Sequence, residues 1–247
     1  MKMQSVDNNV GVGSRAGCIQ KPWLTRVPLA LVVALLCAVL ALPQSVSAQD
    51  LSINARMLAS ARAGDAAAVD RALKEGASPN ARNRLGETAL VIALKSGQPA
   101  LANLMIDSGT DINQAAVNGV TPLMAASHGG FVAIVKTLLA NGADINAVDR
   151  VQKNAMTYAA GQGNTEIVQL LLAAGVDPNA AYAHSLTALM WAAGYGNTET
   201  ARALLAAGAK PDLRDDRNKT ALDLAREGNY SETVKLLESA STAKAPQ

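Results

Sequence analysis

One spacing limits what this chain can fold into, because the same residue types return every 33 positions. The three clearest series are Gly76, Gly109, Gly142, Gly175 and Gly208; Asn80, Asn113, Asn146, Asn179 and Asp212; and Thr88, Thr121, Asn154, Thr187 and Thr220. Three independent series that hold one period over five copies indicate an internal repeat, and periods of 20–50 residues are typical of stacked arrays. The 199 residues from 49 to 247 have room for about six copies.

Each copy predicts two short helices joined by turns. Threonine and asparagine are good N-cap residues, and Pro122 directly after Thr121 suits the first helical position. The first helix then runs for about eight residues. A second cap position precedes the longer second helix, at Asp65, Gln98, Asn164 and Asn197. The 33-spaced glycines end that helix, because glycine adopts the left-handed conformation of a C′ residue.

A helix pair of this size cannot bury its apolar face alone, so neighbouring pairs must supply the core. We expect the core to hold the Leu or Met of the first helix and the Leu-Leu pairs of the second. These are Leu90, Leu123, Met156, Leu189 and Leu222, with Leu138-Leu139, Leu171-Leu172 and Leu204-Leu205. Truncating any of them to alanine should cost about 2–5 kcal/mol.

The ends of the array differ from its middle. The first unit has Ala55 at the cap position, and the last unit slips register by one residue after Ala225. Polar outer faces on terminal repeats keep such arrays soluble. We therefore divide the chain into a signal peptide (1–48), an N-terminal capping repeat with the first loop (49–84), four central repeats (85–216), a C-terminal capping repeat (217–238) and a disordered tail (239–247).

Residues 1–48 have the pattern of a removable secretory signal. Val27–Leu42 holds 16 residues without a charge after Lys21 and Arg26, and Val46 and Ala48 are small residues at the exit. We expect cleavage between Ala48 and Gln49. A retained membrane anchor is the alternative, although 16 residues are short for a span of about 20.

Removal of this segment changes the character of the chain. The remaining residues hold 18 basic and 19 acidic side chains, so nothing attracts them to nucleic acid or to an anionic membrane. Both cysteines, Cys18 and Cys37, are lost with the signal, which excludes disulfides and thiolate chemistry. A thiol-free, alanine-rich chain behind a bacterial type of signal predicts a periplasmic protein without a membrane segment in its mature form.

The repeat resembles the ankyrin repeat. The resemblance covers roughly residues 53–238 and rests on Thr121-Pro122-Leu123, on Gly142-Ala143-Asp144-Ile145-Asn146-Ala147, and on Gly119 two residues before Thr121. It implies an all-α ankyrin solenoid of stacked helix-turn-helix units with hairpin-like loops, about six repeats including caps.

Two departures from the ankyrin pattern stand out. Where ankyrin repeats often carry a histidine three residues after the threonine, this chain has Val91, Met124, Thr157, Met190 and Asp223. The hydrogen bonds of that histidine must be absent or replaced. Gln152 also stands where glycine is usual, which predicts a distorted turn in that unit.

The same resemblance predicts that a partner protein binds the loop tips and the first-helix face, as in a cupped hand. The tip residues are Arg84, Leu85, Val117, Asn118, Arg150, Val151, His184, Asp216 and Arg217, and the face residues are Lys95, His128, Tyr158, Gln162, Trp191 and Tyr195. Tyr and Trp are typical interface anchors. Packing between repeats is the alternative role for Tyr158 and Trp191.

Motifs for catalysis, cofactors or metals are not found in the sequence. The two histidines, His128 and His184, match no metal-binding spacing, and the glycines follow the repeat rather than a phosphate loop. We therefore predict a monomeric, non-catalytic interaction module that uses no cofactor and binds a protein whose identity the sequence leaves open. The alternative is a protective or assembly factor for an exported enzyme, such as a peroxide-detoxifying one.

Overall fold

The computed structural model describes residues 52–242, all of which belong to the second of two compact units, residues 48–247. The predicted signal peptide, its cleavage site at Ala48 and Gln49, and residues 243–247 lie outside the described part. Within residues 52–242, no helix has both the length and the apolar character needed to cross a bilayer.

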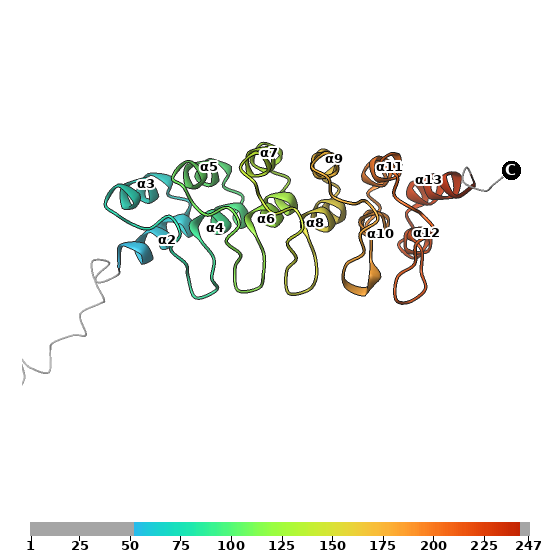
Figure 1. Cartoon of the computed structure of the whole chain (residues 1–247), viewed down its shortest axis with the longest axis horizontal. Helices are drawn as coiled ribbons and strands as arrows, with labels where there is room; N and C mark the ends of the chain where they lie inside the picture. Colours follow the sequence, from blue (N-terminus) through green and yellow to red (C-terminus); the bar gives the residue numbers. More distant parts are fainter. Residues whose placement is uncertain (1–51, 243–247) are drawn as a thin grey trace, which may run out of the picture. The chain divides into compact units, whose positions relative to one another are not determined.

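Twelve α-helices in residues 52–242 form six consecutive pairs (Figure 1). The first helices are α2 (Ile53–Ala63), α4 (Ala89–Lys95), α6 (Pro122–Gly129), α8 (Ala155–Gln162), α10 (Ala188–Gly194) and α12 (Ala221–Glu227). The second helices are α3 (Ala66–Lys74), α5 (Pro99–Asp107), α7 (Val132–Ala140), α9 (Thr165–Ala173), α11 (Thr198–Ala206) and α13 (Ser231–Thr242). The predicted all-α solenoid is confirmed.

The two kinds of helix form two parallel rows, and the long loops extend beyond the row of first helices (Figure 1). Each first helix packs on the first helix of the next pair, and each second helix packs on the next second helix. One loop carries a short 3₁₀ turn, η2 (Ala183–Ser185), and an isolated bridge between Ala181 and Thr187.

The predicted caps of the first helices are confirmed. The side chains of Thr88, Thr121, Asn154, Thr187 and Thr220 each accept a hydrogen bond from the backbone N–H three residues later. Proline is the first residue of both α5 and α6, where its missing N–H costs no helical hydrogen bond.

The second cap position works differently from the prediction. Asp65 caps α3 through its side chain, but Gln98, Asn164 and Asn197 make no side-chain cap bond. Instead the amide of Asn164 donates to the carbonyl of Ser127 at 2.8 Å, and that of Asn197 donates to Ala160 at 2.9 Å. These two asparagines therefore join one repeat to the preceding repeat.

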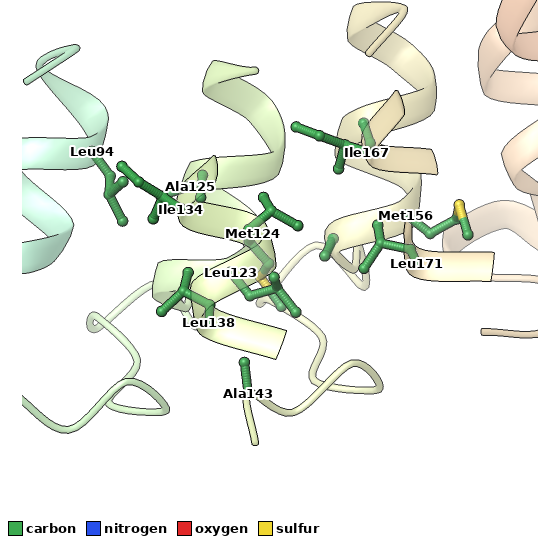
Figure 2. Packing of buried hydrophobic residues seen from close by; sticks show 14 of the residues in the cluster. Leu94, Leu123, Met124, Ala125, Ile134, Leu138, Ala143, Met156, Ile167 and Leu171 are labelled. Carbon is green, nitrogen blue, oxygen red and sulfur yellow. The ribbon is translucent and has the colours of Figure 1, made fainter. Parts of the chain in front are cut away.

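The core is a continuous apolar layer between the helix pairs, and Figure 2 shows its middle portion. The predicted first-helix residues Leu90, Leu123, Met156 and Leu189 are buried, whereas Leu222 of the last unit is only partly buried. Each Leu-Leu pair divides: Leu138, Leu171 and Leu204 are fully buried, and Leu139, Leu172 and Leu205 are partly buried. The prediction that both leucines fill the core is wrong for the second of each pair, because successive helical residues point about 100° apart.

Both ends differ from the prediction in detail. Helix α2 is capped by Ser52, whose hydroxyl accepts from the N–H of Ala55, so Ala55 lies inside the helix rather than at its cap. Helix α13 continues to Thr242, four residues into the segment predicted as a disordered tail. In that extension the Ser241 hydroxyl donates to the carbonyl of Leu237, a fully buried residue.

Candidate functional site

The loop tips are the solvent-facing ends of the long loops, around residues 84–85, 117–118, 150–151, 183–184 and 216–217. All nine tip residues predicted to bind a partner are exposed. Three of them are large and apolar, since Leu85 is 60%, Val117 48% and Val151 59% exposed. Apolar side chains held in water at the ends of ordered loops are available for burial against another molecule.

Each tip turns at a residue with a left-handed backbone. That residue is Gly86 (φ 71°) and Gly119 (φ 84°) in the first two loops, then Gln152 (φ 58°), Ser185 (φ 57°) and Asn218 (φ 64°). These five positions continue the 33-residue period. The third turn therefore keeps its backbone conformation without glycine, and the predicted distortion does not affect its φ.

A buried carboxylate organises the third turn, as the side chains of Asn83 and Asp215 organise the first and the fifth. One oxygen of Asp149 accepts hydrogen bonds from the backbone N–H groups of Val151 at 2.9 Å and Lys153 at 2.8 Å. Its other oxygen accepts from the Tyr158 hydroxyl at 2.6 Å. Asp149 is 4% exposed, so this buried side chain ties the loop to helix α8.

Backbone hydrogen bonds join each loop tip to the next. Val117 N–H donates to Leu85 at 2.8 Å, and Arg150 N–H donates to Asn118 at 2.9 Å. At the third tip the N–H of Ala183 donates to the carbonyl of Gln152 at 3.3 Å, one residue later than the equivalent acceptor, Val151. The departure caused by Gln152 is therefore found in the link between loops rather than within the turn.

We call the solvent-facing side of the first helices the inner face, defined by Lys95, His128, Tyr158, Gln162, Trp191 and Tyr195. Lys95, His128, Gln162 and Tyr195 are exposed, whereas Tyr158 and Trp191 are partly buried. The rings of Trp191 and Tyr195 stack at 5.9 Å with an interplanar angle of 10°, and Tyr195 is 58% exposed. The structure thus presents an ordered aromatic pair to solvent.

Tyr158 serves the scaffold more than the surface. Its ring packs edge-on against His128 at 5.7 Å, and its hydroxyl is bound to Asp149. Burial, followed by the hydrogen bond to the Asp149 carboxylate and that group's negative charge, raises the pKa of Tyr158 far above its usual range. Its phenol therefore stays neutral and fixes the third loop against α8.

Two hollows lie along the inner face. The larger, about 500 Å³, is lined mainly by apolar groups that include Leu94, Met124 and Phe131. The smaller, about 240 Å³, is lined by Lys153, Trp191, Tyr195 and their neighbours. His128 and Tyr158 line both hollows, so the two adjoin along α4, α6, α8 and α10 and are treated together. We call the pair the inner groove.

A comparison with protein-family models matches ankyrin repeats in three overlapping copies, at residues 56–149, 98–182 and 156–245. The chain belongs to the ankyrin-repeat family. A search of curated proteins returned no match. Ankyrin repeats generally serve as protein–protein interaction modules and are typically non-catalytic.

This ankyrin array replaces the usual histidine hydrogen bond in three of its units. The backbone N–H of each cap residue is accepted by Thr157 Oγ1 at 3.0 Å, by Asp223 Oδ2 at 2.9 Å, and more weakly by the sulfur of Met190 at 3.5 Å. The N–H and hydroxyl of Thr220 hold the pKa of Asp223 below its usual range, although burial opposes this. Three different side chains therefore brace the same turn.

Charged groups of the ankyrin array also follow the repeat. Glu87 and Lys95, eight residues apart, form an ion pair at 2.6 Å, and Lys219 and Glu227 pair across the same interval. Although burial raises the pKa of Glu87, hydrogen bonds from Lys95 and Asn83 outweigh it and hold that pKa below its usual range. Lys95, predicted to contact a partner, is therefore already engaged within its own repeat.

Sequence reasoning missed Lys153, the charged residue of the inner groove. Its ammonium lies 4.0 Å from the centre of the Trp191 ring and 5.7 Å from that of Tyr158. Its register could have identified it, because Glu87, Val120, Lys153 and Leu186 occupy the same position of successive repeats, 33 residues apart. Phe131, which lines the larger hollow, was also missed because it replaces an expected helix cap.

Proposed function

We propose that this ankyrin array is a non-catalytic, monomeric module that binds a partner protein through its inner groove and loop tips. The Trp191–Tyr195 stack, which lines the smaller hollow and leaves Tyr195 58% exposed, carries the proposal. Aromatic side chains that line a surface hollow are typical centres of binding energy, because they bury a large area at a small entropic cost. The role of the individual tip residues, from Arg84 to Arg217, remains part of this proposal.

Photocrosslinking tests the proposal at single-residue resolution. A photoreactive phenylalanine analogue replaces Tyr195 in the full chain, expressed in the native cell. The matched control places the same group at Gln169, an exposed residue of the second-row helix α9. We expect a discrete crosslinked protein from position 195 and none from position 169.

Equal crosslinking from both positions, or none from position 195, would refute the inner-face proposal. The identity of a crosslinked protein also separates the two roles considered from the sequence. A peroxide-detoxifying enzyme would favour a protective or assembly function, and any other protein would favour a general binding module.

We further propose that the protein is exported to the periplasm with its signal peptide removed. This proposal rests on Val27–Leu42 and on the small residues before Gln49. N-terminal sequencing of the protein recovered from cells tests it directly. A chain that begins at Gln49 supports export with cleavage, whereas a chain that begins before Val27 refutes cleavage and favours a retained anchor.

A further inference from the structure

The inner groove contains a positive charge that its own repeat does not neutralise. Positions eight residues apart hold the Glu87–Lys95 and Lys219–Glu227 ion pairs in the first and last of the five long loops. Lys153 occupies the same repeat position as Glu87 and Lys219. The residue eight positions after it is Gly161, which has no side chain to pair with it.

No other carboxylate takes that place within residues 52–242. The ion pairs of this part of the chain do not include Lys153. The nearest acidic group along the loop, Asp149, is committed to two backbone N–H groups and to the Tyr158 hydroxyl. The ammonium instead lies over the face of Trp191.

The surroundings of Lys153 restrict where its charge can point. Its ammonium lies over the Trp191 ring at 4.0 Å, with the Tyr158 ring at 5.7 Å, and the residue lines the smaller hollow. A cation already positioned by aromatic faces loses little side-chain freedom when it pairs with an anion, which favours binding. Gly161 offers no side chain to compete for the ammonium, and the rings of Trp191 and Tyr195 lie 3.6 Å and 3.9 Å from where its Cβ would stand.

The adjoining part of the groove has the opposite character. Leu94, Met124 and Phe131 line the larger hollow, and the two hollows meet at His128 and Tyr158. A ligand that fills the whole groove must therefore carry an anionic group at one end and an apolar group at the other. A protein segment with an acidic side chain and a neighbouring apolar side chain has this composition.

We propose that Lys153, Trp191 and Gly161 form a carboxylate-binding subsite for an aspartate or glutamate side chain of a partner segment, whose apolar side chain enters the larger hollow. The proposal rests on the proposed protein-binding function and specifies the chemistry of the partner. The ligand carboxylate takes the place that Glu227 holds beside Lys219.

The test uses peptides selected on the full chain from a phage-displayed library of random dodecamers. Selected peptides are synthesised with acetylated and amidated ends, so that only side chains carry charge, and their dissociation constants are measured by fluorescence anisotropy. Each peptide is paired with a version in which its Glu or Asp becomes Gln or Asn. The protein variants are Lys153→Met, Gly161→Glu and Gln169→Glu.

We expect the acid-to-amide change to weaken binding to the wild-type protein about tenfold and to have no effect on Lys153→Met, which keeps the stem but not the charge. Gly161→Glu should weaken acidic peptides about tenfold, because its carboxylate occupies the subsite from within. Gln169→Glu adds the same charge on the exposed side of α9, outside the groove; it is the matched control and should bind as wild type. Circular dichroism melts establish that each variant is folded.

The outcomes separate the subsite from the proposed function. If peptides bind and lose affinity in Tyr195→Ala, but the acid-to-amide change acts equally on wild type and Lys153→Met, the subsite is overturned and the binding function stands. Selection of peptides without acidic residues has the same meaning. If no selected peptide depends on Tyr195, both the inner-groove function and the subsite are overturned.

Discussion

The division of each Leu-Leu pair leads to a quantitative prediction at α9, in the middle of the array. Leu171 is 0% exposed and Leu172, its neighbour along the helix, is partly buried. The two substitutions Leu171→Ala and Leu172→Ala remove the same atoms from adjacent positions. They share helix propensity and unfolded-state effects, so the difference between them reports burial.

The magnitudes follow from the positions of the two side chains. Leu171→Ala leaves a cavity between α9 and its neighbours and should lower the free energy of unfolding by about 3–4 kcal/mol, within the range for fully buried leucines. Truncating leucine removes three carbons worth about 0.8 kcal/mol each when fully buried, so the half-buried Leu172 should cost about 1 kcal/mol. The two variants should therefore differ by at least about 2 kcal/mol.

Urea denaturation of the full chain, followed by circular dichroism at 222 nm, measures the difference. With a slope of about 2 kcal/mol per molar urea, the midpoint of Leu171→Ala should fall about 1 M below that of Leu172→Ala. A slope that differs between the variants would mean that repeats unfold separately. Equal midpoints at equal slopes would refute the assignment of Leu171 to the core and Leu172 to its edge.

Three further predictions concern the turns and the links between repeats. Gln152→Gly should raise the free energy of unfolding by about 1 kcal/mol, because it removes a non-glycine residue from a left-handed backbone position. Gly119→Ala should lower it, since the added Cβ would lie 2.8 Å from the Asp149 Cα. Thermal melts that show the opposite signs would contradict both expectations. Burial opposes ionisation of Asp215, but hydrogen bonds from the Lys219 and Arg217 N–H groups and from the Arg217 side chain outweigh it and lower the pKa of Asp215. The ionised carboxylate therefore stabilises the fold fully above the ordinary pKa of 3.8, and this contribution is lost as the pH falls through the lowered pKa. Melting temperature measured from pH 6 to pH 2 should decline less steeply for Asp215→Asn than for the wild type. Asn197→Ala should cost about 1–3 kcal/mol in urea denaturation, because the carbonyls of Ala160 and Gly161 lose their donor, and a cost below about 0.5 kcal/mol would show that water replaces it.

The regular part of this fold could be predicted from the sequence because each repeated residue has a local physical role. The Thr88 side chain and its counterparts accept a hydrogen bond from the first turn of their own helix, and glycine ends a helix because its backbone adopts the left-handed conformation. Such roles depend on neighbours within one unit. The period then reproduces the unit, so that helix order, loop positions and the all-α class follow without knowledge of tertiary contacts.

The errors fall where a residue acts between units. Asn164 and Asn197 have the side chains of N-cap residues, yet their amides reach carbonyls 36 and 37 positions earlier in the chain. Similarly, Leu171 and Leu172 are identical in type, and the directions from which α7, α8 and α11 approach α9 decide which of the two is buried. No local rule contains that information.

In the candidate site, residues could be predicted where their type alone indicates a role, and were missed where the role depends on other units. Tyr195 could be selected from the sequence as an exposed aromatic residue, because its type alone marks it as an anchor. Lys153 could not, because lysine is common on surfaces and its significance depends on two rings supplied by α8 and α10. Its distinction becomes visible only when Glu87–Lys95 and Lys219–Glu227 are known to be paired.

In a repeat protein, features shared by all units describe the scaffold, so features that vary between units point to specificity. The fold needs a capping side chain before each first helix and buried apolar residues in each second helix, and every unit keeps both. It does not need an ion pair across each first helix: of the five long loops only the first and the last have one. In the unit of Lys153 the partner position is Gly161, next to the Trp191–Tyr195 stack. A random loss of the partner would leave the charge in water at any loop. Here the charge instead lies over an aromatic ring, inside the groove that the stack borders, which is the arrangement expected of a site that binds an external carboxylate.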